Sequence, residues 1–256
     1  MDSVGDALPI LELREHFLEG LRATGRVVLR APTGSGKSTQ APQMLLESGL
    51  LEETSQIVIL QPRRLAARLL AERVASERGS VPGEEVGYQV RHERCAGDAT
   101  RILFVTEGIL LRRWMTDPRL TGVGAVLIDE FHERHLYGDL LLGIVRRLQQ
   151  GARPDLKLAV MSATLEPGPL EEYLSPCRVV ESEGRMFPVS VEYLRREAEG
   201  RAVWDLAADA VRRVFPVGEG HALIFMPGGY EIRKTVQALQ GVLPGGVPVL
   251  PLHGEL

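Results

Sequence analysis

The stretch Ala31-Pro32-Thr33-Gly34-Ser35-Gly36-Lys37-Ser38-Thr39 follows an apolar segment at 27–29 and precedes a segment with helical character. A loop of small residues between a strand and a helix lets backbone N–H groups surround phosphate oxygens, and the helix directs its positive end at them. Lys37 can reach the terminal phosphates, and Ser38 can coordinate Mg²⁺. We therefore predict that residues 33–39 bind a nucleoside triphosphate, with Mg²⁺ as cofactor.

The loop departs from the general pattern at one position, because Ala31 stands where a glycine is usual. Only three of the 30 lysine and arginine residues are lysines, and Lys37 is one of them. A lysine at the one position that requires a compact ammonium supports the prediction. A glycine-rich turn before an ordinary helix is the alternative.

Composition describes a globular chain of 256 residues with 44% hydrophobic content. Its apolar runs are too short to span a bilayer, and no basic region with an apolar stretch opens the chain, so we expect no membrane segment and no signal peptide. Cys95 and Cys177 lack metal-type spacing and are expected to be buried free thiols in the cytoplasm. A net charge of −4 gives no global attraction for nucleic acid, so such binding would require a local arginine patch.

Apolar runs and helical patterns alternate along the first part of the chain. The predicted strands are 26–30, 56–60, 101–105, 123–129 and 156–161, and the predicted helices are 8–22, 37–48, 63–77, 107–115 and 137–150. Nearly continuous apolar strands that alternate with helices indicate an α/β fold with a parallel sheet covered by helices on both faces. Ligands of such sheets bind at the carboxyl ends of the strands.

Gly184 and Pro188 interrupt this rhythm, and a second alternating series follows. We predict a first domain at 1–182, and a junction with the beginning of a second domain at 183–256. The second series comprises strands at 189–194, 221–226 and 247–251 and helices at 201–214 and 229–240. Because so few strands would leave much apolar surface uncovered, we expect the second domain to be incomplete.

Two adjacent carboxylates, Asp129 and Glu130, end the apolar run at 125–128. If this strand is a neighbour of the one before the phosphate loop, both acids emerge beside that loop. Asp129 would then help to hold Mg²⁺, together with Ser38 and Glu130, and Glu130 would orient and deprotonate the attacking water. A strand end with solvated acids is the alternative.

The segment Asp129-Glu130-Phe131-His132 resembles the signature of DEAH-type helicases of superfamily 2, and Phe131 in place of the usual alanine resembles the bacterial HrpB-type branch. Other helicase motifs have similar segments in the expected order. They lie at 61–68, 105–111, 162–165, 184–189, 223–232 and 251–254. The resemblance covers the chain from about residue 10 onward and implies two RecA-like domains, the second of them truncated.

Position by position, the resemblance implies further site residues. Glu130, His132 and Lys37 would be catalytic, and His132 would couple the γ-phosphate region to the domain interface. Arg73 would stack on the adenine, which reads no base edge and so implies loose nucleotide selectivity. The backbone of a nucleic-acid strand would be contacted by Arg63, Arg64, Thr106 and Glu107, and hydrolysis would be coupled to strand movement by Ser162 and Thr164.

Each of these residues also has a simpler explanation. Arg63, Arg64 and Arg73 fit an exposed helix surface, and Thr106 fits an N-cap. His132 fits a structural histidine at a strand end. Ser162 and Thr164 fit caps of the turn that follows them.

The resemblance implies an ATP-dependent helicase that acts on single-stranded RNA, with DNA as the second choice of substrate. No arginine motif of the second domain follows 251–254, so this chain alone is expected to bind nucleotide with little turnover. The alternatives are a nucleotide-dependent switch that binds RNA or protein without unwinding, and a DNA translocase of the same superfamily.

Overall fold

The computed structural model describes residues 8–164, 168–182, 189–193, 200–215 and 220–253. The chain divides into two compact units, Met1–Phe187 and Pro188–Leu256. The boundary predicted after residue 182 adjoins 183–188, which lie outside the described residues.

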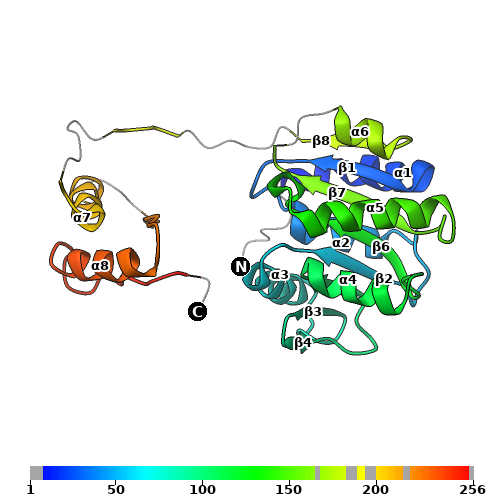
Figure 1. Ribbon diagram of the computed structural model, residues 1–256, viewed down its shortest axis with the longest axis horizontal. Coiled ribbons are helices and arrows are strands. Elements are labelled where there is room, and N and C mark those ends of the chain that lie inside the picture. Colours follow the sequence, from blue (N-terminus) through cyan, green and yellow to red (C-terminus); the bar gives the residue numbers. More distant parts are fainter. Residues whose placement is uncertain (1–7, 165–167, 183–188, 194–199, 216–219, 254–256) are drawn as a thin grey trace. The chain divides into compact units, whose positions relative to one another are not determined.

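The first unit is built on an eight-stranded sheet with the order β4-β3-β5-β2-β6-β7-β1-β8 (Figure 1). Its strands are β1 (Arg26–Arg30), β2 (Gln56–Leu60), β3 (Val86–Val90), β4 (Glu93–Cys95), β5 (Ile102–Val105), β6 (Val123–Ile128), β7 (Lys157–Ser162) and β8 (Arg178–Glu181). Every neighbouring pair is parallel except β3 and β4, which are antiparallel. All five strands predicted in this unit are present, and the fold is the predicted RecA-like α/β sheet.

Helices cover both faces of this sheet, as predicted (Figure 1). One face carries α1 (Arg14–Thr24), α2 (Lys37–Glu47) and α3 (Arg64–Glu77), and the other carries α4 (Glu107–Thr116), α5 (Leu136–Gln150) and α6 (Pro169–Leu174). Successive side chains of the central strands alternate between the two cores. Leu127 packs on the α2 side, whereas Val126 and Ile128 pack on the α5 side. Burial on both faces explains why these strands are continuous apolar runs.

The first predicted helix, 8–22, begins differently from the prediction. A 3₁₀-helix, η2 (Pro9–Leu13), precedes α1. Prediction missed β3, β4, β8 and α6 altogether. These elements are short, and β4 and β8 include charged residues, as is common for strands at a sheet edge.

In the second unit, helices α7 (Val203–Val214) and α8 (Gly229–Gln240) confirm two predictions. They pack together, with the rings of Trp204 and Tyr230 meeting edge to face at 5.8 Å. The three predicted strands are wrong for the described residues, because 189–193, 221–226 and 247–251 form no strand. Their apolar side chains are exposed, Phe225 by 85%. A strand requires a neighbour for its N–H and C=O groups, and the described part of this unit provides none.

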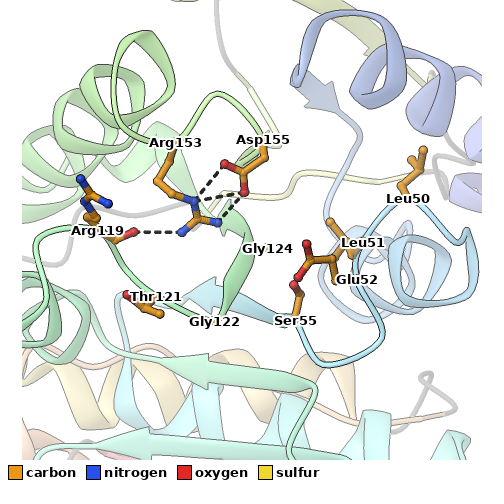
Figure 2. Close-up of a pocket in the computed structure, with 10 residues that line it drawn as sticks. All are labelled: Leu50, Leu51, Glu52, Ser55, Arg119, Thr121, Gly122, Gly124, Arg153 and Asp155. Carbon is orange, nitrogen blue, oxygen red and sulfur yellow. Dashed lines mark hydrogen bonds and ion pairs between the residues drawn. The ribbon is translucent and has the colours of Figure 1, made fainter.

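The amino ends of the central strands surround a cavity of about 380 Å³ (Figure 2). Arg153, just before β7, lies on one side of it. Its guanidinium donates to the carbonyl oxygens of Arg119, Leu120 and Val123 at 2.7–3.0 Å and pairs with Asp155. This arginine fixes the turn that leads into β6, at the edge of the sheet opposite to the phosphate loop.

Cys95 and Cys177 carry free thiols, but they are half-buried rather than buried. Within the described residues, no helix is both long enough and apolar enough to cross a membrane.

Candidate nucleotide site

The predicted phosphate loop connects the carboxyl end of β1 with the first turn of α2. Gly34 and Gly36 have φ values of 82° and 91°, a conformation that glycine adopts without a steric penalty. Ala31 is not among the described residues with positive φ, so its position does not require glycine. Its N–H donates to the carbonyl oxygen of Ser162 at 3.1 Å, which ties the loop to β7.

The segment before α1 supports the loop from behind. Ile10 is 1% exposed, and its N–H donates to the carbonyl oxygen of Ser35 at 3.4 Å. A Cβ atom at Gly36 would lie 3.0 Å from Leu8 Cδ1 and 3.2 Å from Ile10 Cγ2. The loop is therefore closely packed on the side that faces η2.

Lys37 is buried, with 2% of its surface exposed. Among the described residues, its Nζ has one carboxylate within ion-pair distance, Glu130 Oε1 at 3.8 Å. The hydroxyl of Ser35 is also buried and has no hydrogen-bond partner in the described part of the chain. Buried polar groups of this kind usually have partners. A buried ammonium and hydroxyl with so few contacts fit a site that an anionic ligand completes.

The two acids follow β6, which pairs with β7 and not with β1. The condition that the two strands are neighbours is therefore not met, since β7 lies between them. The acids and the loop converge nevertheless, because Glu130 reaches Lys37 across the end of β7. The acids and the phosphate loop therefore lie together, as the predicted nucleotide site requires.

Asp129 is 3% exposed and accepts a short hydrogen bond from Gln61 Nε2. The pKa of Asp129 is raised to about 6, first by burial and also by the Glu130 charge, while a hydrogen bond from Ser38 and the Lys37 charge oppose this shift. Ser38 and Asp129 are thus in contact at the bottom of the site. A hydroxyl and a carboxylate beside the phosphate loop form a donor set that fits Mg²⁺.

Glu130 begins a tight turn, η3 (Phe131–Glu133). Glu130 and Arg134, at either end of the turn, adopt left-handed conformations with φ of 50° and 49°. Such conformations are uncommon for residues other than glycine and are found at functional sites. Phe131, where the helicase signature usually has alanine, is buried in the α5-side core and holds the turn in place.

His132 lies beside Glu130 on the same turn. Its Nδ1 is 3.4 Å from Glu130 Oε2, but it makes no hydrogen bond with this oxygen or with any other described group. The explanation of a structural histidine at a strand end is not tested by this contact. The coupling role stays a prediction.

The sequence profile of the DEAD/DEAH box helicase family matches residues 14–173, which include the loop, the acids and the sheet that joins them. The chain belongs to this family. Its match to the ATP-dependent RNA helicase HrpB of Escherichia coli is 43% identical over 251 residues, 98% of this chain and 30% of that protein. The probable ATP-dependent RNA helicase DHX34 of mouse is 40% identical over 98% of this chain and 22% of its own length.

A crystal structure of the Escherichia coli DEAH/RHA helicase HrpB superimposes with a TM-score of 0.86 at 42% identity. The alignment covers 93% of this chain and 30% of that one. This chain therefore spans about a third or less of the length of these relatives.

The four residues predicted to contact a nucleic-acid strand follow β2 and β5, which are neighbours in the sheet. Arg63 and Arg64 are exposed at the start of α3, and Thr106 and Glu107 are partly buried at the start of α4. Thr106 occupies the N-cap position, but its hydroxyl makes no capping bond. The N-cap position expected for Thr106 is therefore confirmed, without a hydrogen bond from its side chain. Burial raises the pKa of Glu107, and the nearby His135 opposes this effect.

Arg73 lies on the exposed side of α3, and its Nε is 2.6 Å from Glu77 Oε1. Glu77 also accepts hydrogen bonds from Gln40 and Gln43 of α2, both at 2.8 Å. The i,i+4 pair with Glu77 supports the explanation of a helix-surface residue. Glu77 also links Arg73 to α2, the helix that follows the phosphate loop. Stacking of Arg73 on the adenine stays a prediction.

Ser162 ends β7 and is fully buried. Its Oγ accepts a hydrogen bond from the Thr164 N–H at 3.3 Å, as the turn-cap explanation expects. Its carbonyl also binds the phosphate loop, and Thr164 is exposed. The structure therefore places Ser162 between the loop and the acids, while their coupling role stays a prediction.

Two residues of this edge received no role from the sequence. Gln61 is 2% exposed and binds Asp129, and Glu133 pairs with Arg63 at 2.6 Å. Gln61 directly follows the apolar run of β2, which is the one signal that could have marked it. Nothing local in the sequence connects Glu133 with Arg63, since the contact depends on β2 and β6 being neighbours.

Proposed function

We propose that this chain contains the nucleotide-binding and strand-contacting domain of an ATP-dependent RNA helicase of the DEAH type. The observation that carries the proposal is the convergence of Lys37, Asp129 and Glu130 at one edge of the sheet in a member of this family. The RNA preference rests on the names of the relatives, several of which are RNA helicases.

In this mechanism the triphosphate lies along the phosphate loop, and Lys37 neutralises the charge on its terminal phosphates. Ser38 and Asp129 would hold Mg²⁺, which would supply positive charge to the phosphates. Glu130 is partly exposed beside Lys37, so its carboxylate can accept a proton from a water positioned for in-line attack. Hydrolysis then changes the contacts of the loop with β7 and η3.

Glu130→Gln in the full-length protein tests the mechanism. We expect RNA-stimulated ATP hydrolysis to fall by roughly 10²–10³-fold, because the amide cannot take the proton, while ATP still binds. Phosphate release and the affinity for a fluorescent ATP analogue would be measured side by side. Unchanged hydrolysis would remove Glu130 from its proposed role.

Glu133→Gln is unsuitable as the control because it lies on the same turn, so Glu72→Gln on α3 serves instead. Glu72 pairs with Arg68 on the exposed side of that helix. Single-stranded RNA and single-stranded DNA would be compared as stimulators. Stimulation by DNA alone would favour a translocase, and hydrolysis that responds to neither would favour a switch.

We further propose that the 256-residue chain alone binds ATP with little turnover. In related nucleotide hydrolases an arginine from outside the phosphate site contributes roughly 10³–10⁵ in rate. Duplex separation by this chain at the rate of its full-length relatives would contradict the proposal.

A further inference from the structure

Glu133 connects the predicted strand-contacting edge with the turn that carries the catalytic glutamate. Arg63 follows β2 and Glu133 follows β6, and these neighbouring strands end in register at Leu60 and Ile128. Arg63 Nη2 lies 2.6 Å from Glu133 Oε1. A carboxylate therefore occupies the guanidinium that is predicted to bind a strand phosphate.

The two partners differ in their freedom to move. The Arg63 side chain is 72% exposed and sits at the start of α3, whereas the Glu133 side chain is 24% exposed. Glu133 also accepts from His135 Nε2 at 3.1 Å, and this bond and the Arg63 charge keep the pKa of Glu133 below its usual range. Glu133 is thus a fixed, charged acceptor, and Arg63 is the partner that can leave it.

The turn that carries Glu133 is also tied to α5 and to its own Phe131 ring. The guanidinium of Arg134 binds both carboxylate oxygens of Asp139 at 3.0 and 3.1 Å and lies 5.3 Å from the centre of the Phe131 ring. The Glu133 N–H donates to the Glu130 carbonyl at 2.9 Å. A force on Glu133 therefore acts on Glu130 directly.

We infer that Glu133 is a positioning residue that substitutes for a strand phosphate on Arg63 and reports strand binding to Glu130. When a strand phosphate takes the place of the carboxylate on Arg63, Glu133 is released, because a guanidinium binds either group by charge-assisted hydrogen bonds. The turn then no longer has its tie to α3, and Glu130 moves from its contact with Lys37 toward the attacking water. This inference rests on the proposed function.

The test uses the full-length protein and a short fluorescent oligouridylate. Without nucleotide, Glu133→Gln should bind the oligonucleotide about two- to fivefold more tightly, the range expected for loss of an exposed competing ion pair. Its hydrolysis without RNA should rise by a similar factor, while its rate at saturating RNA stays that of the wild type. A merely structural role would instead lower the saturated rate or the stability.

Glu72→Gln on α3 is the control, because it also removes one negative charge but not the contact with Arg63. It should change neither the oligonucleotide affinity nor the hydrolysis rate without RNA by more than about 1.5-fold. Arg63→Ala should weaken oligonucleotide binding. In the Arg63→Ala background, Glu133→Gln should have no further effect, because the cycle isolates the pair.

The outcomes distinguish the inference from the function beneath it. If wild-type hydrolysis does not respond to RNA, both fail. If it responds, and Glu133→Gln behaves as Glu72→Gln does or acts equally in the Arg63→Ala background, then only the role of Glu133 is overturned.

Discussion

Two cations lie at opposite edges of the same sheet, Lys37 with a buried side chain and Arg153 with a half-buried one, and their surroundings differ sharply. At the amino edge, Arg153 donates to three backbone carbonyls and pairs with Asp155. Figure 2 shows the pair with Asp155 and the bond to the Arg119 carbonyl. At the carboxyl edge, Lys37 has Glu130 at 3.8 Å as its described carboxylate partner. A cation whose N–H groups all have protein acceptors stabilises the fold. A cation with few protein acceptors can instead bind a negatively charged ligand.

The strongest test of this comparison is Lys37→Met. We expect the affinity for a non-hydrolysable ATP analogue to fall by about 10²–10³-fold, or roughly 3–4 kcal/mol, because the terminal phosphates lose their ammonium. The free energy of unfolding should stay constant or rise by up to about 1 kcal/mol, since a buried charge is removed. Titration calorimetry and urea denaturation measure the two quantities, with Lys157→Met as the control. Unchanged affinity would mean that Lys37 does not serve the ligand.

Arg153→Met should reverse this pattern. Three carbonyls lose their donor, so we expect the free energy of unfolding to fall by about 2–3 kcal/mol while ATP-analogue affinity stays within twofold. Arg119→Met is the matched control, because Arg119 lines the same cavity and its side chain is exposed. Equal stability of the two variants would show that the bonds of Arg153 contribute nothing.

Gly124→Ala tests how closely the amino edge is packed. A Cβ atom there would lie 2.8 Å from Ser55 Cβ and 3.3 Å from Leu51 Cδ2, so we expect a loss of about 1–2 kcal/mol. Ser55→Gly removes the clashing atom and should recover part of that loss in the double variant. Additive effects in urea denaturation would rule out this clash as the cause.

The smallest effect is expected for Asp155→Asn. The hydrogen bond from Arg153 lowers the pKa of Asp155 below its usual range, and burial opposes this shift in part. A lowered pKa in the folded state stabilises the protein above the unfolded pKa, and this contribution is lost as the pH falls through the folded pKa. Because the Asp155 side chain is 63% exposed, we expect less than about 1 kcal/mol at pH 6 and less still below about pH 4. A difference between the two proteins that grows toward acid would contradict this sign.

The centre of the fold could be predicted from the sequence, and its edges could not. Runs such as 125–128 are apolar because helices cover both of their faces, so composition alone reveals them. β4 and β8 are short and partly charged, and their pairing depends on neighbours that are distant in the chain. In the second unit, the apolar run within 221–226 indicated a strand, but such a run forms one only beside a partner.

The site shows the same division. Residue types and order predicted Lys37, Asp129 and Glu130, because the chemistry of phosphate and water restricts the choice. The position of β7 between the loop and the acids follows from the strand order, which no local pattern encodes. Gln61 and Glu133 act through contacts across neighbouring strands, so they became visible only with the register of β2 and β6.

The pairing of β1 with β7 also determines when the site can assemble during translation. β1 and its phosphate loop leave the ribosome early, but the strand that supports them is among the last parts of the first unit to be made. Until β7 emerges, the Ala31 N–H has no Ser162 carbonyl to bind, and the acids after β6 have no scaffold beside the loop. A nascent chain that stops within α5 therefore holds every residue of the phosphate loop and both acids, but it lacks the strand that lies between them.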